Sequence, residues 1–309
     1  MKNALSYWKK YDLVFKHFSF KKIYKEILGF AKKLGNPFTK KSNKGRNFKI
    51  SPEEYVAYTV FEIVTGNAPF RDMELGSELY VRKHIDHSTF GKNFQKIPYD
   101  YLRKLLELTG KFLEKLLGKA SVYLADSTGM VTNMYYDTEF KGKSIRRKLD
   151  FKLHSFVGYY PNKKLTYIKT GLGSNKHTSD SEGACVMLDE YDMGWAYFSA
   201  DSSYDFEKLH RKINEKGLFP MIKPRNTKLS RATKTKEHRR WFNPRLYKEI
   251  RHLVETIFGG LENKGLLHTR MKREDNIHKF SLVVQIRHNL WNLMKLNINL
   301  FYLLIDKLI

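Results

Sequence analysis

Apolar residues recur every three or four positions through much of the first 118 residues, a spacing typical of helices. One helix should begin at Ser51, because Ser51 can cap it, Pro52 suits its first turn and Glu54 completes a capping box. Its apolar face continues to Gly66, a residue that commonly ends helices. A second pattern of this kind predicts a helix over residues 102–117.

Between these two helices, residues 88–94 could form a short helix capped by Ser88. A short polar helix in a basic helical module is a candidate for the recognition helix of a helix-turn-helix motif. A simple connector between longer helices has the same pattern, and the sequence leaves both interpretations open.

After Gly118 the pattern becomes one of short aromatic and β-branched runs bounded by turn residues, which is typical of strands. Helix patterns separate the later runs, and a long helix should follow Pro244. The order of three strands, helix, strand, helix, strand and helix predicts an α/β domain with a mixed sheet. The runs are 122–125, 156–159, 165–168, 196–199 and 219–222, with helices over 180–191 and 205–216.

A chain of 309 residues is long enough for two domains. We therefore expect an all-helical domain over residues 1–118 and an α/β domain over residues 119–309.

Charge points to a polyanionic partner. The chain has 57 Lys and Arg against 32 Asp and Glu, a formal net charge of +25. Residues 1–50 hold fourteen Lys and Arg against two acids, and residues 223–251 hold eleven against two. Such clustering favours a nucleic acid over a merely basic protein.

Cys185 is the only cysteine, so no disulfide can form within the chain and a cysteine-based zinc site is excluded. The N-terminus has no apolar core of signal-peptide length. Charged residues such as Arg287 and Lys295 interrupt the apolar C-terminal stretch, which argues against a membrane span. We expect a soluble cytoplasmic protein that associates with the nucleoid.

Three acids occupy positions suited to metal chemistry. Asp126 should end the first strand, Asp201 should end the fourth, and Glu255 lies in the long helix after Pro244. Carboxylates are the hard oxygen ligands that hold Mg²⁺ in phosphodiester-cleaving sites. Each acid alone has a plainer explanation: strand-end Asp residues often form turns, and Glu255 can pair with Arg251 one helical turn away. Their order within a basic chain favours a metal site.

The three motifs are Asp126-Ser127-Thr128-Gly129, then Ala200-Asp201-Ser202-Ser203-Tyr204-Asp205, then Arg251-x-x-Val254-Glu255-x-x-Phe258-Gly259. In this order, with their acids 75 and 54 residues apart, they resemble those of the DDE insertion-sequence transposases of bacteria and archaea. The resemblance implies an RNase H-like catalytic core in which Asp126, Asp201 and Glu255 bind the catalytic metal.

The resemblance also implies that Tyr247 and Arg251 contact DNA near the scissile phosphate, although Tyr247 lies four residues before Arg251 where relatives have three. The Lys that the family places two turns after the Glu falls on Glu262, which leaves Lys264 as the nearest candidate.

The implied reaction is hydrolysis of the phosphodiester at a transposon end, followed by attack of the freed 3′-OH on target DNA. We expect Mg²⁺ as the cofactor, for which Mn²⁺ could substitute, terminal inverted repeats and target DNA as partners, and a homodimer on paired ends. Two alternatives stay open: a DNA-binding protein without catalysis, and a nuclease that cuts without joining.

Other candidates are less specific. Lys223, Arg225 and Lys228 head a basic run, continued by Arg231, Arg239 and Arg240, that could line a DNA groove. Trp241 and Phe242 could stack on a base, but core packing is the favoured interpretation. His177 and Asp180 precede a predicted helix, where Asp180 is expected to act as a cap.

Overall fold

Helices form the first part of the described chain. The computed structural model describes residues 19–39, 47–140, 142–148, 150–189, 191, 194–225 and 242–296, without the side chains of 136–140, 143 and 145–148. The N-terminal helices are α2 (Phe20–Leu34), α3 (Pro52–Gly66), α4 (Phe70–Val81), α5 (His87–Lys96) and α6 (Tyr99–Leu117).

The predicted start of α3 is confirmed. Ser51 Oγ accepts a hydrogen bond from the Glu54 backbone N–H at 3.2 Å, and the Glu54 carboxylate accepts one from the Ser51 N–H at 3.0 Å. This capping box satisfies two N–H groups that have no partner within the helix. The helix ends at Gly66, where Asn67 takes a left-handed conformation with φ of 50°.

The short helix α5 is also present, but the prediction that Ser88 caps it is wrong. Asp86 is the N-cap, and its carboxylate accepts a hydrogen bond from the Ser88 N–H at 2.8 Å. Asp is as good a cap as Ser, so a sequence with both residues near the helix start does not by itself decide between them.

A mixed five-stranded sheet in the order β5-β4-β1-β6-β7 follows the helices, as the sequence predicts for the α/β region. β1 pairs antiparallel with β4, and β4 with β5, whereas β1, β6 and β7 run parallel. The strands are β1 (Val122–Met130), β4 (Phe151–Tyr160), β5 (Leu165–Asn175), β6 (Ala196–Ala200) and β7 (Leu218–Ile222). The connecting helices are α7 (Asp180–Asp189) and α8 (Glu207–Glu215), with short 3₁₀ turns η1 (Pro161–Lys163) and η2 (Ser202–Tyr204).

The prediction that Asp126 ends the first strand is wrong. β1 continues to Met130 because its ladder with β4 extends from Val122↔Tyr159 to Met130↔Phe151. Asp126 lies opposite Ser155, whose hydroxyl donates to Gln285 on the face of the sheet covered by the last helix, α11 (Glu274–Lys295).

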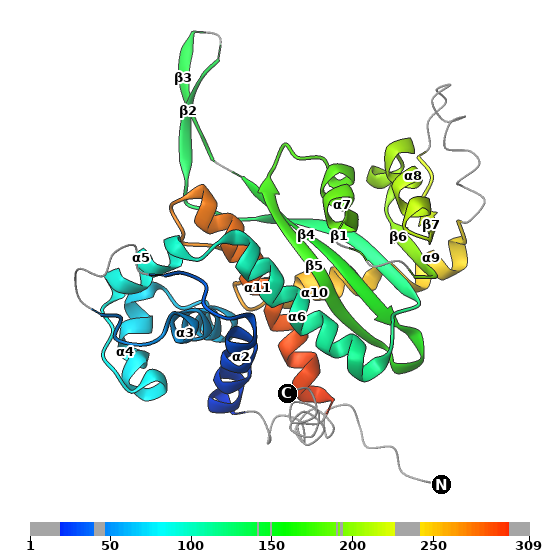
Figure 1. Cartoon of the computed structure of the whole chain (residues 1–309). Coiled ribbons are helices and arrows are strands. Elements are labelled where there is room, and N and C mark those ends of the chain that lie inside the picture. The colour runs from blue at the N-terminus through cyan, green and yellow to red at the C-terminus, as the bar shows by residue number, and fades with distance from the viewer. Residues whose placement is uncertain are drawn as a thin grey trace.

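An insertion that the sequence did not predict separates β1 from β4. β2 (Tyr135–Phe140) and β3 (Lys143–Lys148) form their own two-stranded antiparallel sheet. This hairpin projects away from the five-stranded sheet (Figure 1). It extends beyond the end of the sheet at which β1 finishes and β4 begins.

The long helix expected after Pro244 is divided into α9 (Pro244–Ile250) and α10 (His252–Glu262) at Arg251. Asn243 caps α9 by accepting hydrogen bonds from the next two N–H groups of the helix, at 3.1 Å each. α10 packs against β1, which brings the end of the chain back to the first strand.

Helices α6 and α11 pack against each other and against β5 (Figure 1). α11 approaches β5 so closely that a Cβ atom at Gly171 or Gly173 would lie 2.4 Å or less from its side chains. Asn289 of α11 also bonds both backbone groups of Ile168, at 2.7 and 2.8 Å. α11 contacts α3 and α5 as well, so it connects the sheet to the N-terminal helices. Among the described helices, none combines the length and apolar character needed to span a membrane.

Candidate active site

Asp126 and Asp201 lie side by side at one end of the sheet. The parallel ladder between β1 and β6 finishes with the pair Leu124↔Ser199, and each acid lies two residues beyond its member of that pair. Asp201 directly follows β6, as predicted, whereas Asp126 is still inside β1. Both acids thus lie just beyond the parallel pairing of these adjacent strands, which places the two carboxylates at the same edge.

Neighbouring serines hold both carboxylates. Asp126 Oδ1 accepts a hydrogen bond from the Ser127 N–H at 2.8 Å. Asp201 Oδ1 accepts from the Ser203 N–H at 2.8 Å and from Ser203 Oγ at 2.5 Å, which makes Asp201 the N-cap of η2.

Glu255 reaches the same region from α10. Its carboxylate is 57% exposed and lies 3.2 Å from Nε of Arg251, which is 52% exposed. This is the i, i+4 ion pair expected from the sequence, and at such exposure it contributes little to stability. Glu255 is therefore free to exchange its partner for a ligand.

Electrostatics joins the three acids into one site. Burial, together with the charges of Asp201, Asp180 and Glu255, raises the pKa of Asp126 to about 6 against the lowering effect of the Ser127 N–H. A carboxyl group whose pKa is raised by burial and by like charges lies where its negative charge is poorly compensated.

Asp180, the first residue of α7, is a fourth member of the site. Its carboxylate accepts hydrogen bonds from Ser127 Oγ at 2.7 Å and Ser203 Oγ at 3.4 Å, and it pairs with Lys152 at 3.0 Å. Burial alone would raise the pKa of Asp180, but the bonds from Ser127 and Lys152 outweigh it and hold the pKa below its usual value. Asp180 thus connects the residues that follow Asp126 and Asp201.

The prediction that Asp180 caps the helix is wrong. Ser179 is the capping residue: its hydroxyl accepts from the Glu182 N–H, and Glu182 accepts from the Ser179 N–H, each at 3.2 Å. The Ser-x-x-Glu capping box is visible in the sequence and would have left Asp180 available for another role.

Tyr247 is buried in α9, with its ring packed against Phe242 at 5.4 Å between centroids. Burial raises the pKa of its hydroxyl, and so do the charges of Asp201, Asp126 and Glu255. No described residue forms a hydrogen bond with this hydroxyl. Phe242 packs against the core, as favoured from the sequence.

Arg225 is half-buried and bonds within the chain. Its side chain donates to the Ser202 and Ser203 carbonyls at 2.7 and 2.9 Å, and its guanidinium lies 4.2 Å from the Phe206 ring centroid. These bonds fix the turn that follows Asp201.

The other basic candidates are spread over the chain. Lys223 is exposed and extends the pairing of β7 with β6, because its N–H donates to the Ala200 carbonyl at 3.1 Å. Lys264 is exposed after α10. Lys228 lies outside the described residues, as do Arg231, Arg239, Arg240 and Trp241.

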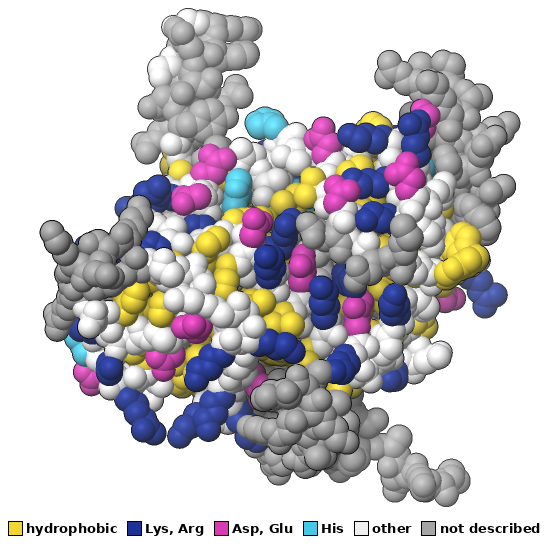
Figure 2. Space-filling view, in the orientation of Figure 1, with side chains coloured by type: hydrophobic (Ala, Val, Ile, Leu, Met, Phe, Trp, Pro, Cys, Tyr) yellow, Lys and Arg dark blue, Asp and Glu magenta, His cyan; other side chains and the backbone are white. Residues whose placement is uncertain are grey.

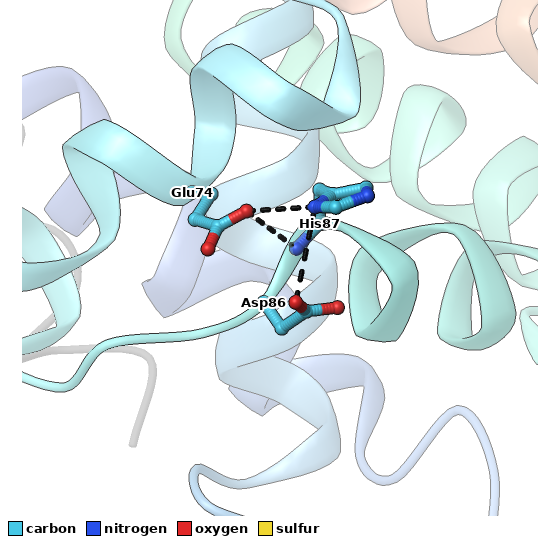
Figure 3. A group of neighbouring side chains, drawn as sticks. All are labelled: Glu74, Asp86 and His87. Atoms are coloured by element: carbon cyan, nitrogen blue, oxygen red, sulfur yellow. Dashed lines mark hydrogen bonds and ion pairs between the residues drawn. The ribbon is translucent and has the colours of Figure 1, made fainter.

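The side chains of Asp126, Asp201 and Glu255 do not approach closely enough for one ligand atom of each to lie within 4.8 Å of the others. Within the described part of the chain, only Glu74, Asp86 and His87 meet that condition (Figure 3).

The residues at the sheet edge nevertheless fit a divalent cation. Their donors are hard oxygens, as Mg²⁺ and Mn²⁺ prefer, their negative charge is uncompensated at Asp126, and the buried Tyr247 hydroxyl faces the same charges without a partner among the described residues.

With this geometry established, the comparison with protein families identifies the class. A model described as Transposase DDE domain matches residues 117–290, more than half of the chain. The chain belongs to this family, and the resemblance to DDE transposases is confirmed.

None of the curated proteins matches the chain. Among solved structures, the cryo-EM structure of the piggyBac transposase synaptic complex with hairpin DNA is similar over 70% of this chain and 51% of that chain. The identity is 14% and the TM-score 0.31, a likeness too distant to carry an argument about the site. The chain spans about half the length of that transposase.

Proposed function

We propose that this protein is a metal-dependent DNA transposase that hydrolyses the phosphodiester at a transposon end and joins the freed 3′-OH to target DNA. One observation carries the proposal: Asp126 and Asp201 lie just beyond the parallel pairing of adjacent strands, within electrostatic reach of Glu255, in a chain of the transposase DDE family.

Asp126, Asp201 and Glu255 would hold Mg²⁺, or Mn²⁺ in its place. A bound divalent ion activates the attacking oxygen and stabilises the leaving one. Ser127 and Ser203 orient the two aspartates, and Asp180 links those serines. Arg251, whose guanidinium lies 3.2 Å from the Glu255 carboxylate, would contact a phosphate of the bound DNA.

The catalytic domain would be RNase H-like and extend over residues 119–309. Support comes from the strand order β5-β4-β1-β6-β7, with three antiparallel strands followed by two parallel ones. Residues 1–118 would form the DNA-binding domain that recognises the inverted repeats, with α5 as a candidate recognition helix.

Double-stranded DNA is the proposed partner, bound by a homodimer on paired ends. The net charge of +25 supports a polyanionic partner. Figure 2 shows Lys and Arg spread over one face of the molecule with acids between them, so no single basic stripe marks a DNA path there. Lys223, Arg225, Lys228, Lys264, Tyr247 and Arg251 remain the proposed DNA contacts.

The test uses a plasmid that carries the gene with its flanking DNA. We expect the purified protein to cut at the gene's borders with Mg²⁺ or Mn²⁺ and not with a chelator. Precleaved ends should then be joined to a second plasmid. Cutting without joining would indicate a nuclease, and DNA binding without any metal-dependent cutting would indicate a non-catalytic DNA-binding protein.

A further inference from the structure

A basic groove of about 590 Å³ lies between α10, α11 and the turn that precedes β5. Five cationic side chains line it, and no Asp or Glu does: the cations are Lys163, Lys164, Lys264, Arg287 and Lys295. The chain contains 32 acids, yet none of them lines this concave surface. A concave surface lined by cations alone concentrates a positive electrostatic field.

The charges of the lysines are not neutralised within the described chain. Lys163, Lys164, Lys264 and Lys295 form no ion pair with any described residue. Burial lowers the pKa of Lys295, and no carboxylate offsets that effect. The four lysine charges, which have no counter-charge among the described residues, repel one another, so an anionic ligand would stabilise the groove.

The walls of the groove are well fixed. Arg287 lies 3.7 Å from the Trp291 ring centroid and donates a hydrogen bond to the Val64 carbonyl of α3. His288 bonds Thr166 at 3.0 Å, and burial lowers its pKa to about 4, so it adds no charge near neutral pH. A rigid groove binds a ligand at a lower cost in conformational entropy.

The groove and the acidic centre use different faces of α10. The α10 residues in the groove recur three or four positions apart, which defines one helix face, and Glu255 is outside that set: they are Leu253, Thr256, Ile257, Gly260 and Leu261, followed by Lys264. A ligand in the groove is therefore separate from the phosphate at the metal centre.

We propose that this groove binds the phosphate backbone of a second stretch of the DNA duplex, across α10 from the metal centre. The inference rests on the proposed function, since it takes DNA as the partner. Phosphate oxygens spaced along a strand match a row of flexible lysines and a fixed arginine. DNA held on both faces of α10 would position the helix that carries Glu255.

The test removes two groove charges that were not among the proposed DNA contacts. Lys163→Gln and Lys164→Asn are combined, with Asn chosen because residue 164 has φ of 48°, a conformation that Asn tolerates. The control, Lys208→Gln with Arg211→Gln, removes two exposed charges from α8. Binding of a fluorescent mixed-sequence duplex is measured over a range of salt concentrations.

We expect the groove variant to bind more weakly and its slope of log affinity against log salt to fall by about 0.9 for each lost contact, with no change in the control. Equal slopes in variant and control would overturn the inference. So would a variant that keeps DNA affinity but loses stabilisation by inorganic phosphate, which would indicate a small anion.

Metal-dependent cutting by the wild-type protein is measured alongside. If the wild type cuts and the groove variant behaves as the control, the inference alone fails. If the groove variant loses affinity but the wild type never cuts, the groove stands and the proposed catalysis fails.

Discussion

The described residues include two groups of potential metal ligands, and the tighter one is the less convincing metal site. At the α4–α5 junction, Glu74 accepts hydrogen bonds from the His87 N–H at 3.1 Å and from the His87 ring at 2.8 Å (Figure 3). Glu74 also lies 3.2 Å from His84. Asp86 caps α5. Each carboxylate there already has a donor.

At the sheet edge the carboxylates also have donors, but at Asp126 the net effect of its surroundings on the pKa is the reverse. Hydrogen bonds from His87 hold the pKa of Glu74 below its usual value, whereas burial and neighbouring carboxylates raise the pKa of Asp126 to about 6. Poorly compensated negative charge, rather than short distances between ligand atoms, distinguishes a site that a cation would stabilise from one whose carboxylates are already stabilised by hydrogen bonds.

The largest effect expected from this contrast is a loss of metal-dependent cutting. Asp126→Asn, Asp201→Asn and Glu255→Gln should each reduce metal-dependent cutting by on the order of 10³-fold or more, because each removes a ligand charge. Double variants should be little worse than single ones, since the three act as a unit.

Two controls accompany these variants in the plasmid-cutting assay. Glu262→Gln alters an exposed acid on the same helix, and Glu74→Gln alters the tighter cluster; both should retain activity. Asp205 is unsuitable as a control, because it is buried and bonds His210 and the Arg225 N–H. Loss of cutting in Glu74→Gln with retention in Asp126→Asn would reverse the assignment.

A divalent metal should raise the thermal stability of the protein by binding at the sheet edge and not at the α4–α5 junction. At about a hundred times its dissociation constant, Mg²⁺ or Mn²⁺ should stabilise the protein by about 2.7 kcal/mol. Differential scanning calorimetry should show this gain in the wild type and in Glu74→Gln, but not in Asp126→Asn. A gain that disappears in Glu74→Gln instead would place the ion at the α4–α5 junction.

The same calorimetric measurement over a range of pH tests the raised pKa of Asp126. Below about pH 6 Asp126 becomes protonated, so the metal-induced gain should shrink as pH falls through that value. Without metal the sign is opposite: the folded state holds this proton more tightly than the unfolded chain, so the carboxyl adds stability as pH falls from 6 towards 4. A metal response independent of pH in this range contradicts the assignment.

A smaller effect is expected from breaking the α4–α5 cluster. Glu74→Gln removes the charge that both histidines face, so the melting temperature should fall by a few degrees without metal dependence. Glu78→Gln, which alters a more exposed acid near His84, is the matched control and should change less.

The smallest effect concerns Arg251. Because Arg251 and Glu255 are both more than half exposed, Arg251→Gln should change stability by less than about 0.5 kcal/mol. Cutting should nevertheless decrease if Arg251 contacts a phosphate, with Lys248→Gln, an exposed charge on α9, as the control. Unchanged cutting would remove Arg251 from the proposed DNA contacts.

Local patterns in the sequence predicted local structure well. The capping box at Ser51 needs only residues three apart, and the strand and helix order around Asp201 follows from short runs with clear boundaries. The same runs placed Asp201 at the end of β6. The motifs also made Asp126 and Glu255 candidates for the site, although Asp126 lies within its strand rather than at its end.

Features that depend on contacts between residues far apart in the chain could not be predicted from the sequence. β1 extends to Met130 only because β4, more than twenty residues later, continues the ladder. Asp180 joins the acidic site through Ser127, 53 residues away. Neither contact leaves a periodic signal, since both depend on how the strands are ordered in the sheet.

The ladder between β1 and β4 also determines where the length of this chain can vary. Asp126 faces the side of α11, and its neighbour Ser127 lies opposite His154, beneath α7. Because successive strand residues alternate in direction, one residue inserted between Val122 and Asp126 would turn the carboxylate towards the wrong layer. Val131 still pairs with His268, but the β2–β3 hairpin beyond it lies outside the ladder. We therefore expect homologous chains to differ by insertions and deletions in that hairpin and to keep a constant length before Asp126.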